Sequence, residues 1–177
     1  MITLRLLRRR PTGQIGQYAE VERSFSPEEV KLFGSLVKDQ NFLHESVPWS
    51  DDIETMQASF PITKAHISEG LVIRDQKSDT EMTRPLVQGI LLSSMFSSIF
   101  AGLVPGCVYI NQTLSFASPV FANELVKSRV TIEKLRRWPK GGIVVQCETQ
   151  IQKAEDETIA IKGTANVWLP QGHRKAN

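Results

Sequence analysis

The fold is decided by the stretch Pro85–Phe116, which reads PLVQGILLSSMFSSIFAGLVPGCVYINQTLSF. No Asp, Glu, Lys or Arg occurs in it, and none follows before Glu124. Its first part, up to Val104, is long enough to raise the hypothesis of a membrane span. Four serines, one glutamine and two glycines favour instead a helix buried on nearly all sides of a soluble core, because such helices also lose their charged face. Pro105 and Gly106 end this helix.

Beyond Gly106 the apolar pattern changes from the helical period to the alternation of a β-strand. One face of the strand that begins at Val108 is apolar, and similar alternation returns in residues 145–151 and 159–167. Turn-forming residues separate the segments, and four strands in succession form an antiparallel sheet. The sequence therefore predicts an α+β chain in which such a sheet wraps one long central helix, which is the hot-dog architecture.

Upstream of this core, residues 18–25 predict a short strand and residues 27 to about 37 a helix. Ser26 is suited to cap that helix, because Pro27 takes its first position and two glutamates follow in the first turn. Residues from about 51 to 84 are polar and irregular in their apolar spacing. A connection of that length inside a domain is usually functional or mobile, so we interpret it as an inserted lid-like segment.

The length of 177 residues and the 41% hydrophobic content fit one domain, which we place at residues 15–170 with a polar tail at 171–177. Residues 1–14 form a basic arm that begins MITLRLLRRR. An Arg-rich start without acids is typical of a mitochondrial presequence, and a plain basic arm is the alternative. The corresponding locations are the mitochondrion and the cytoplasm.

Charge and cysteine content exclude several classes of protein. The net charge is only +2, and four early arginines account for more than that, so the remainder lacks the basic surface that nucleic-acid binding needs. Cys107 and Cys147 belong to no CxxC pair, which argues against a disulfide framework or a zinc site. We expect two buried free thiols in a reducing compartment, and no metal or other cofactor.

The candidate chemistry lies directly after the first predicted helix, in the order Asp39, Asn41 and His44. In an unbroken helix Asp39 and His44 would be about 140° apart around the axis and could not meet. Asn41 favours a break there, because its side chain bonds local backbone and tolerates left-handed turns. A carboxylate and an imidazole around one water can take a proton and return it. Alternatively, Asp39 caps a turn and His44 is an ordinary half-buried ring.

The order D-x-N-x-x-H resembles the hydratase motif of the MaoC-like family, which contains (R)-specific enoyl-CoA hydratases and 3-hydroxyacyl-thioester dehydratases. Further segments resemble that family in the same order, over roughly residues 15–169. They are Gln88-Gly89-Ile90-Leu91 with Phe96-Ser97 for its central helix, Pro105-Gly106 for the end of that helix, and VYINQTLSFASPVF at 108–121 for the next strand and turn.

The resemblance implies a hot-dog homodimer in which Asp39 and His44 activate one water. That water adds to a trans-2-enoyl thioester of coenzyme A or acyl carrier protein, or leaves an (R)-3-hydroxyacyl thioester. With a presequence, the implied enzyme is the dehydratase of mitochondrial fatty-acid synthesis. Gly89 corresponds to the family's glycine at the start of the central helix, where a free N–H can stabilise an enolate oxygen. Close packing of helix on sheet is the alternative reason for Gly89.

Other polar residues have two readings each. Ser97 matches a pocket-lining serine of the family, or bonds back to its own helix. Gln112 is polar on an apolar strand face and needs a buried partner, which we interpret as bracing of the catalytic loop. A group of basic residues either meets a coenzyme A phosphate or an acidic acyl carrier protein, or is a solvated strand and turn. This group consists of Lys127, Arg129, Lys134, Arg136, Arg137 and Lys140.

Three departures from the family concern the site. Lys38 and Phe42 stand where the family usually has Gly and Pro, which help to break the helix. Gln88 replaces a common histidine, and Gln hydrogen-bonds but cannot shuttle a proton. The third departure is the long segment between His44 and Gly89. These departures favour, as an alternative to a hydro-lyase, a non-catalytic hot-dog subunit that binds acyl chains or a partner. A thioesterase is a further alternative, because fold does not fix function.

Overall fold

A computed structural model describes residues 14–39, 41–44 and 84–170. The predicted presequence, most of the inserted segment and the polar tail lie outside these residues. In chain order the elements are β1 (Tyr18–Arg23), α1 (Pro27–Val37), a 3-10 turn η1 (Phe42–His44), α3 (Gly89–Leu103), β2 (Val108–Phe116), β3 (Val126–Arg137), β4 (Ile143–Lys153) and β5 (Ile159–Leu169).

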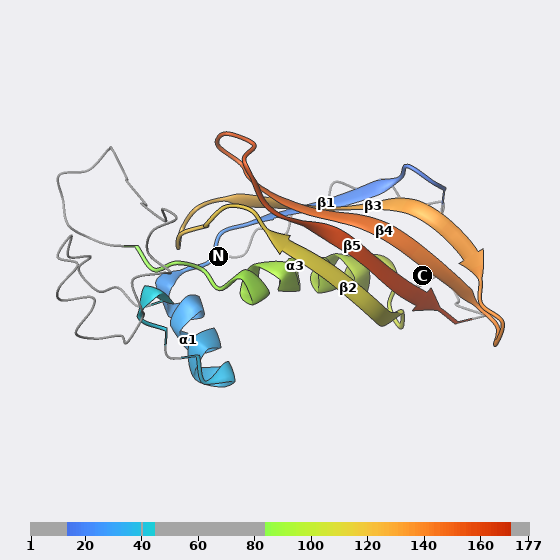
Figure 1. Cartoon of the computed structure of the whole chain (residues 1–177), viewed down its shortest axis with the longest axis horizontal. Coiled ribbons are helices and arrows are strands. Elements are labelled where there is room, and N and C mark those ends of the chain that lie inside the picture. Colours follow the sequence, from blue (N-terminus) through green and yellow to red (C-terminus); the bar gives the residue numbers. More distant parts are fainter. Residues whose placement is uncertain (1–13, 40, 45–83, 171–177) are drawn as a thin grey trace, which may run out of the picture.

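The strands form one sheet in the order β1-β3-β4-β5-β2, and every neighbouring pair is antiparallel. The long helix α3 lies along one face of this sheet, and α1 and η1 sit at the end of the sheet where α3 begins (Figure 1). The predicted succession of one strand, one helix, a central helix and four strands is confirmed, as is the α+β class. The strand predicted over 18–25 is two residues shorter, and Phe25 is instead buried beyond its end.

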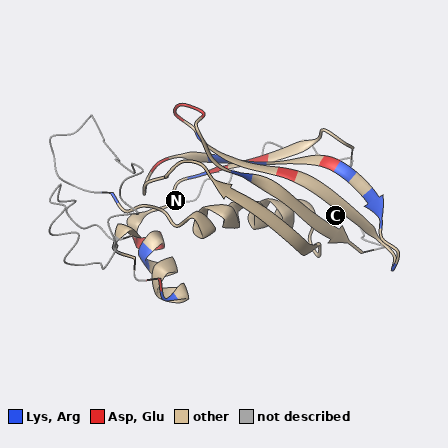
Figure 2. Ribbon diagram, viewed as in Figure 1, with Lys and Arg blue, Asp and Glu red and all other residues tan. Residues whose placement is uncertain are grey.

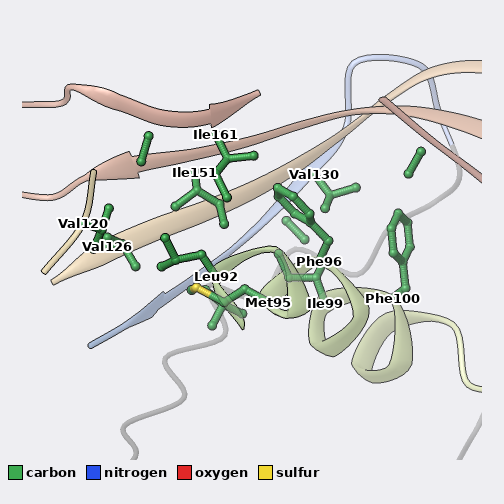
Figure 3. Packing of buried hydrophobic residues seen from close by; sticks show 14 of the residues in the cluster. Leu92, Met95, Phe96, Ile99, Phe100, Val120, Val126, Val130, Ile151 and Ile161 are labelled. Atoms are coloured by element: carbon green, nitrogen blue, oxygen red, sulfur yellow. The ribbon is translucent and has the colours of Figure 1, made fainter. Parts of the chain in front are cut away.

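The core lies between α3 and the sheet. Leu92, Met95, Phe96 and Ile99 of α3 are almost fully buried and point at apolar side chains of the strands, including Ile161 (Figure 3). These four positions follow the three- and four-residue spacing of one helix face. The alternating apolar residues of β3, β4 and β5 supply the opposite surface, so the two periodicities in the sequence meet in one core.

Two expectations about this core are wrong. Helix α3 is not buried on nearly all sides, because its second face, with Ile90, Ser94 and Ser97, is exposed in the single chain. That face lacks charges and, apart from the exposed Ile90, consists of small and polar side chains, which do not require burial. Both cysteines are free, yet only Cys147 is buried, whereas Cys107 is half-buried after the end of α3. Within the described ranges, no helix has the length and apolar content that crossing a bilayer requires.

The strand β2 lies at one edge of the sheet and pairs only with β5 among the described strands. Figure 2 shows that neither β2 nor α3 carries a charged residue, whereas charges lie on α1 and on the other strands. Val108, Ile110 and Phe116 of β2 are large apolar residues that remain exposed. An uncharged, apolar edge of this kind lacks the features that usually keep edge strands from pairing with another chain.

Candidate functional site

The segment that carries Asp39 leaves α1 through a left-handed residue. Lys38 has φ 58° and ψ 34°, and the N–H of Asp39 donates to the carbonyl of Gly34 at 2.9 Å. A left-handed residue at a helix C-terminus is common, but it is usually Gly because a Cβ is disfavoured there. Lys38 therefore adopts the conformation for which the related motif has Gly, and the helix ends at the predicted place.

Two short side-chain contacts then shape the turn. Asp39 Oδ1 accepts from the N–H of Asn41 at 3.0 Å, and Asn41 Oδ1 accepts from the N–H of Leu43 at 3.2 Å. The N–H of His44 donates to the carbonyl of Asn41 at 3.0 Å, which closes the 3-10 turn η1. Asn41 thus supports the loop through its own side chain, as its local hydrogen-bonding tendency predicts.

This turn brings the predicted pair together. Asp39 Oδ2 lies 3.5 Å from His44 Nε2, and the His44 side chain is largely buried. His44 Nδ1 is 2.6 Å from the carbonyl oxygen of Leu86. A carbonyl only accepts, so Nδ1 carries the hydrogen, and in the neutral ring Nε2 carries the lone pair. A carboxylate and an imidazole lone pair therefore converge, and one water can donate an O–H to each of them.

The carbonyl that fixes the tautomer is itself held by backbone pairing. Leu86 donates to the carbonyl of Leu43 at 2.8 Å and forms a β-bridge with Phe121. On either side of Leu86, the N–H of Val87 donates to the carbonyl of Val120, and the carbonyl of Pro85 accepts from the N–H of Ala122, each at 2.8 Å. The residues that lead into α3 are consequently clamped between η1 and the segment after β2, and His44 and the start of α3 are positioned by the same contacts.

A cavity of about 560 Å³ opens beside this pair. Asp39, His44, Gln88 and Gly89 contribute to its wall, so four of the seven predicted site residues share one space. The remaining wall is mainly apolar. It is formed by Phe33, Val37, Leu86, Val87, Ile90, Leu92, Phe116, Ala117, Ser118, Pro119, Val120 and Ile161. An apolar cavity with a few convergent polar groups fits a small apolar ligand with one reactive polar end.

Gly89 is the first residue of α3, where the backbone N–H has no partner within the helix. A Cβ at this position would overlap the ring of Phe116. The close-packing reason for Gly89 therefore applies, and Gly89 also borders the cavity. Close packing and a role in the site are compatible at Gly89, because the Phe116 ring that packs on it is itself part of the cavity wall.

The other predicted residues lie elsewhere. Ser97 is on the exposed face of α3, where its hydroxyl lies beside Tyr109, and it is not in the cavity wall. Burial of the Tyr109 hydroxyl raises its pKa to about 12, although the contact with Ser97 acts in the opposite direction. Gln112 donates to the hydroxyl of Thr149 at 3.1 Å, so among the described residues it braces the sheet and not the loop.

The basic residues weighed as a contact for phosphate or carrier protein separate into two groups. Lys127 and Arg129 form ion pairs with glutamates of β1. The other four lie near the tip of the β3–β4 hairpin, and Figure 2 shows the basic end of β3 at the opposite end of the sheet from α1. Within one chain, this basic group is therefore remote from the cavity.

Three contributors to the site were not among the predicted residues. The Leu86 carbonyl fixes the tautomer of His44, but every residue has a backbone carbonyl, so the residue type does not reveal this role. Phe116 was recognised only as part of an alternating strand. Gly34 is buried under the loop, where a Cβ would lie 3.1 Å from the Asp39 carbonyl oxygen and 3.4 Å from Gln88 Nε2. A glycine inside a predicted helix was the one available signal for that close approach.

No protein-family model matches the chain. Among characterised proteins, the mitochondrial 3-hydroxyacyl-[acyl-carrier-protein] dehydratase of Arabidopsis thaliana is 29% identical over 157 residues, which cover 89% of this chain and 78% of the relative. The (R)-specific enoyl-CoA hydratase of Aeromonas caviae is 29% identical over 160 residues, covering 89% of this chain and 96% of the relative.

Solved structures agree with this similarity. The (R)-hydratase from A. caviae involved in PHA biosynthesis superposes with a TM-score of 0.63 at 28% identity, covering 90% of this chain and 98% of that one. The R-hydratase PhaJ1 from Pseudomonas aeruginosa gives a TM-score of 0.61 at 20% identity, covering 93% and 88%, and supports the fold alone. The chain has the α+β hot-dog fold.

Proposed function

This chain is a homologue of (R)-specific enoyl-CoA hydratases and 3-hydroxyacyl-[acyl-carrier-protein] dehydratases, and we propose that it is a hydro-lyase of fatty-acid metabolism. It interconverts (R)-3-hydroxyacyl thioesters and trans-2-enoyl thioesters, with Asp39 and His44 as its catalytic residues. The observation that carries these roles is the convergence of Asp39 Oδ2 and His44 Nε2 at 3.5 Å, with the His44 tautomer fixed by the Leu86 carbonyl.

In the hydration direction, a water held by Asp39 and His44 attacks C3 of the enoyl thioester. An oxygen lone pair forms the new C3–O bond, and the electrons of the C2=C3 bond move toward the thioester as an enolate. The Asp39 and His44 pair takes one proton from the water and returns a proton to C2. Dehydration follows the same steps in reverse. Acid–base catalysis of this kind contributes about 10²–10⁴-fold to the rate.

The Gly89 N–H supports the other end of the reacting group. It lies at the positive end of α3, and as a first-turn N–H it is free to donate to the thioester oxygen. Charge develops on that oxygen as the enolate forms, so the hydrogen bond strengthens in the transition state. The cavity that holds Gly89 together with Asp39 and His44 gives a single substrate access to all three groups.

The chain is active as a homodimer in this proposal, with the β2 edges of two copies paired about a two-fold axis. The uncharged exposed edge of β2 and the uncharged exposed face of α3 support this arrangement. The substrate is carried by coenzyme A or acyl carrier protein. The site of action is the mitochondrion, which the mitochondrial dehydratases of Arabidopsis thaliana and Solanum lycopersicum support.

A direct test follows the conjugated enoyl-thioester absorbance after purified protein is added to crotonyl-CoA and to a longer homologue. Loss of absorbance without thiol release is the expected result, whereas thiol release would indicate a thioesterase. Asp39→Asn and His44→Ala are each expected to reduce kcat by about 10²-fold or more. A folded wild type that is inactive on both substrates would instead support a non-catalytic acyl-binding subunit. Light scattering reports the oligomeric state independently.

A further inference from the structure

Gln88 is a buried residue whose hydrogen bonding is incomplete. It precedes α3, its side chain is 4% exposed, and its Nε2 donates to the Val30 carbonyl of α1 at 3.1 Å. Its other polar atom, Oε1, has no hydrogen-bond partner among the described residues. Buried side-chain acceptors are nearly always paired, so an unpaired one in a cavity wall requires an explanation.

A structural bridge between α1 and α3 does not explain this acceptor. The bridge to Val30 uses only the donor half of the amide. Rotating the amide by half a turn would place its oxygen against the Val30 carbonyl oxygen, so the hydrogen-bond network fixes which atom faces Val30. The contact of Nε2 with the Val30 carbonyl therefore holds the side chain in place and leaves Oε1 without a partner among the described residues. Its partner must come from outside the described residues that surround it.

An occupant of the cavity can be such a partner, because Gln88 shares the cavity wall with Asp39 and His44. Resting on the proposed function, the occupants are a water with an enoyl thioester, or a 3-hydroxyacyl thioester. Near the reacting carbons of either substrate form, the thioester oxygen accepts and the acyl carbons neither donate nor accept. Both O–H groups of the water are directed at Asp39 and His44, so the group there with an O–H to donate to Gln88 is the hydroxyl at C3 of the 3-hydroxyacyl thioester.

We propose that Gln88 Oε1 accepts a hydrogen bond from the hydroxyl at C3 of the 3-hydroxyacyl thioester, and that Gln88 is a third catalytic residue beside Asp39 and His44. The amide takes no part in proton transfer, because it does not titrate near neutral pH. Its role is to orient the reacting oxygen. Oε1 is buried in the free chain, so the contact forms as the cavity wall adjusts around the ligand.

The experiment compares two ligands that differ only in this hydroxyl. Calorimetry measures the Kd of (R)-3-hydroxybutyryl-CoA and of butyryl-CoA in an Asp39→Asn background, which slows turnover. Adding Gln88→Met, which preserves length but cannot hydrogen-bond in the same way, is expected to weaken the hydroxyacyl ligand about 3- to 10-fold and butyryl-CoA less than about 2-fold. Gln88→His retains one donor and one acceptor and is expected to keep the preference for the hydroxyl.

A matched control is Gln150→Met, because Gln150 lies on β4, bonds to Gln152 and is not in the cavity wall. It is expected to leave both affinities unchanged. Equal weakening of both ligands by Gln88→Met would overturn the proposal, because a purely structural bridge affects them alike. An unchanged hydroxyl preference would overturn it as well. If Gln88→Met does not fold, the side-chain amide resonances of Gln88 provide the measurement, and they must shift more with the hydroxyacyl ligand than with butyryl-CoA.

These results are independent of the test of the proposed function. The proposed function fails if the wild type does not hydrate enoyl-CoA substrates. The role of Gln88 fails if the hydroxyl makes no difference to the effect of Gln88→Met, even when the wild type is an active hydratase.

Discussion

Replacing lysine by glycine is expected to have opposite effects on stability at Lys38, which caps α1, and at Lys31, which lies inside it. Lys38 ends α1 at φ 58°, whereas Lys31 lies inside α1 and is exposed. The left-handed conformation costs a residue with a Cβ roughly 1–2 kcal/mol, and glycine avoids that cost. Glycine also loses more freedom on folding, by about 0.4–1 kcal/mol. Lys38→Gly should therefore raise the free energy of unfolding by about 0–1.6 kcal/mol.

At position 31 the backbone is helical, so glycine relieves no left-handed conformation and only its larger loss of freedom on folding remains. Lys31→Gly places glycine in a regular helix and is expected to lower the free energy of unfolding by about 1 kcal/mol. Urea denaturation of both variants measures the difference directly. Lys38→Ala is the control, because it removes the long side chain but keeps the Cβ, and it should not stabilise the protein. A decrease of 1 kcal/mol or more for Lys38→Gly, about that of Lys31→Gly, would refute the assignment of a left-handed residue at the start of the Asp39 loop.

Three further substitutions test other parts of the structure. Gly163→Ala places a Cβ against a backbone carbonyl of β2, which cannot move alone, so thermal unfolding should show a loss of about 2 kcal/mol or more. Gly89→Ala displaces only the exposed ring of Phe116, so kinetics should show reduced kcat with little change in melting temperature. The Ser26 N–H donates to the Glu29 carboxylate and lowers the pKa of Glu29 below its usual 4.5. The stability that this contact contributes is therefore present above pH 4.5 and is lost on acidification. Glu29→Gln should make the free energy of unfolding depend less steeply on pH in the acid range.

The outcomes that would contradict these expectations are distinct. A Gly163→Ala protein as stable as wild type would contradict the close approach of β5 to β2. A Gly89→Ala protein with full activity would contradict the contribution of the Phe116 ring beside Gly89 to the shape of the cavity. An unchanged acid limb in Glu29→Gln would show that the capping contact does not contribute to the pH dependence of unfolding.

The geometry of the site is set by short-range contacts that different parts of the chain share. Gly34 approaches both the Asp39 carbonyl and the Gln88 amide, and Leu86 contacts both η1 and the His44 ring. The ends of α1 and α3 are therefore fixed relative to each other at the point where the cavity forms. A small shift of either helix would change the Asp39–His44 separation, the tautomer contact and the position of the Gly89 amide together.

The sequence by itself determined the elements of the fold. The charge-free stretch Pro85–Phe116, the change of apolar period after Gly106 and the Ser26 cap each reflect local physics, so their prediction needed no knowledge of distant residues. The order Asp39, Asn41 and His44 likewise indicated a chemical pair, because Asn41 shapes the turn through its own side chain. The burial of α3 was misjudged, because a helix face without charges is compatible both with burial and with exposure of small and polar residues.

Only the tertiary structure decided how that pair is oriented and what surrounds it. The Leu86 carbonyl selects the tautomer of His44, the ring of Phe116 explains the glycine at 89, and the Val30 carbonyl leaves Gln88 with a free acceptor. Each of these contacts joins residues that are distant in sequence, and two of the three use a backbone carbonyl that every residue possesses. Residue type cannot reveal such contacts, because they depend on where the packed elements place the backbone.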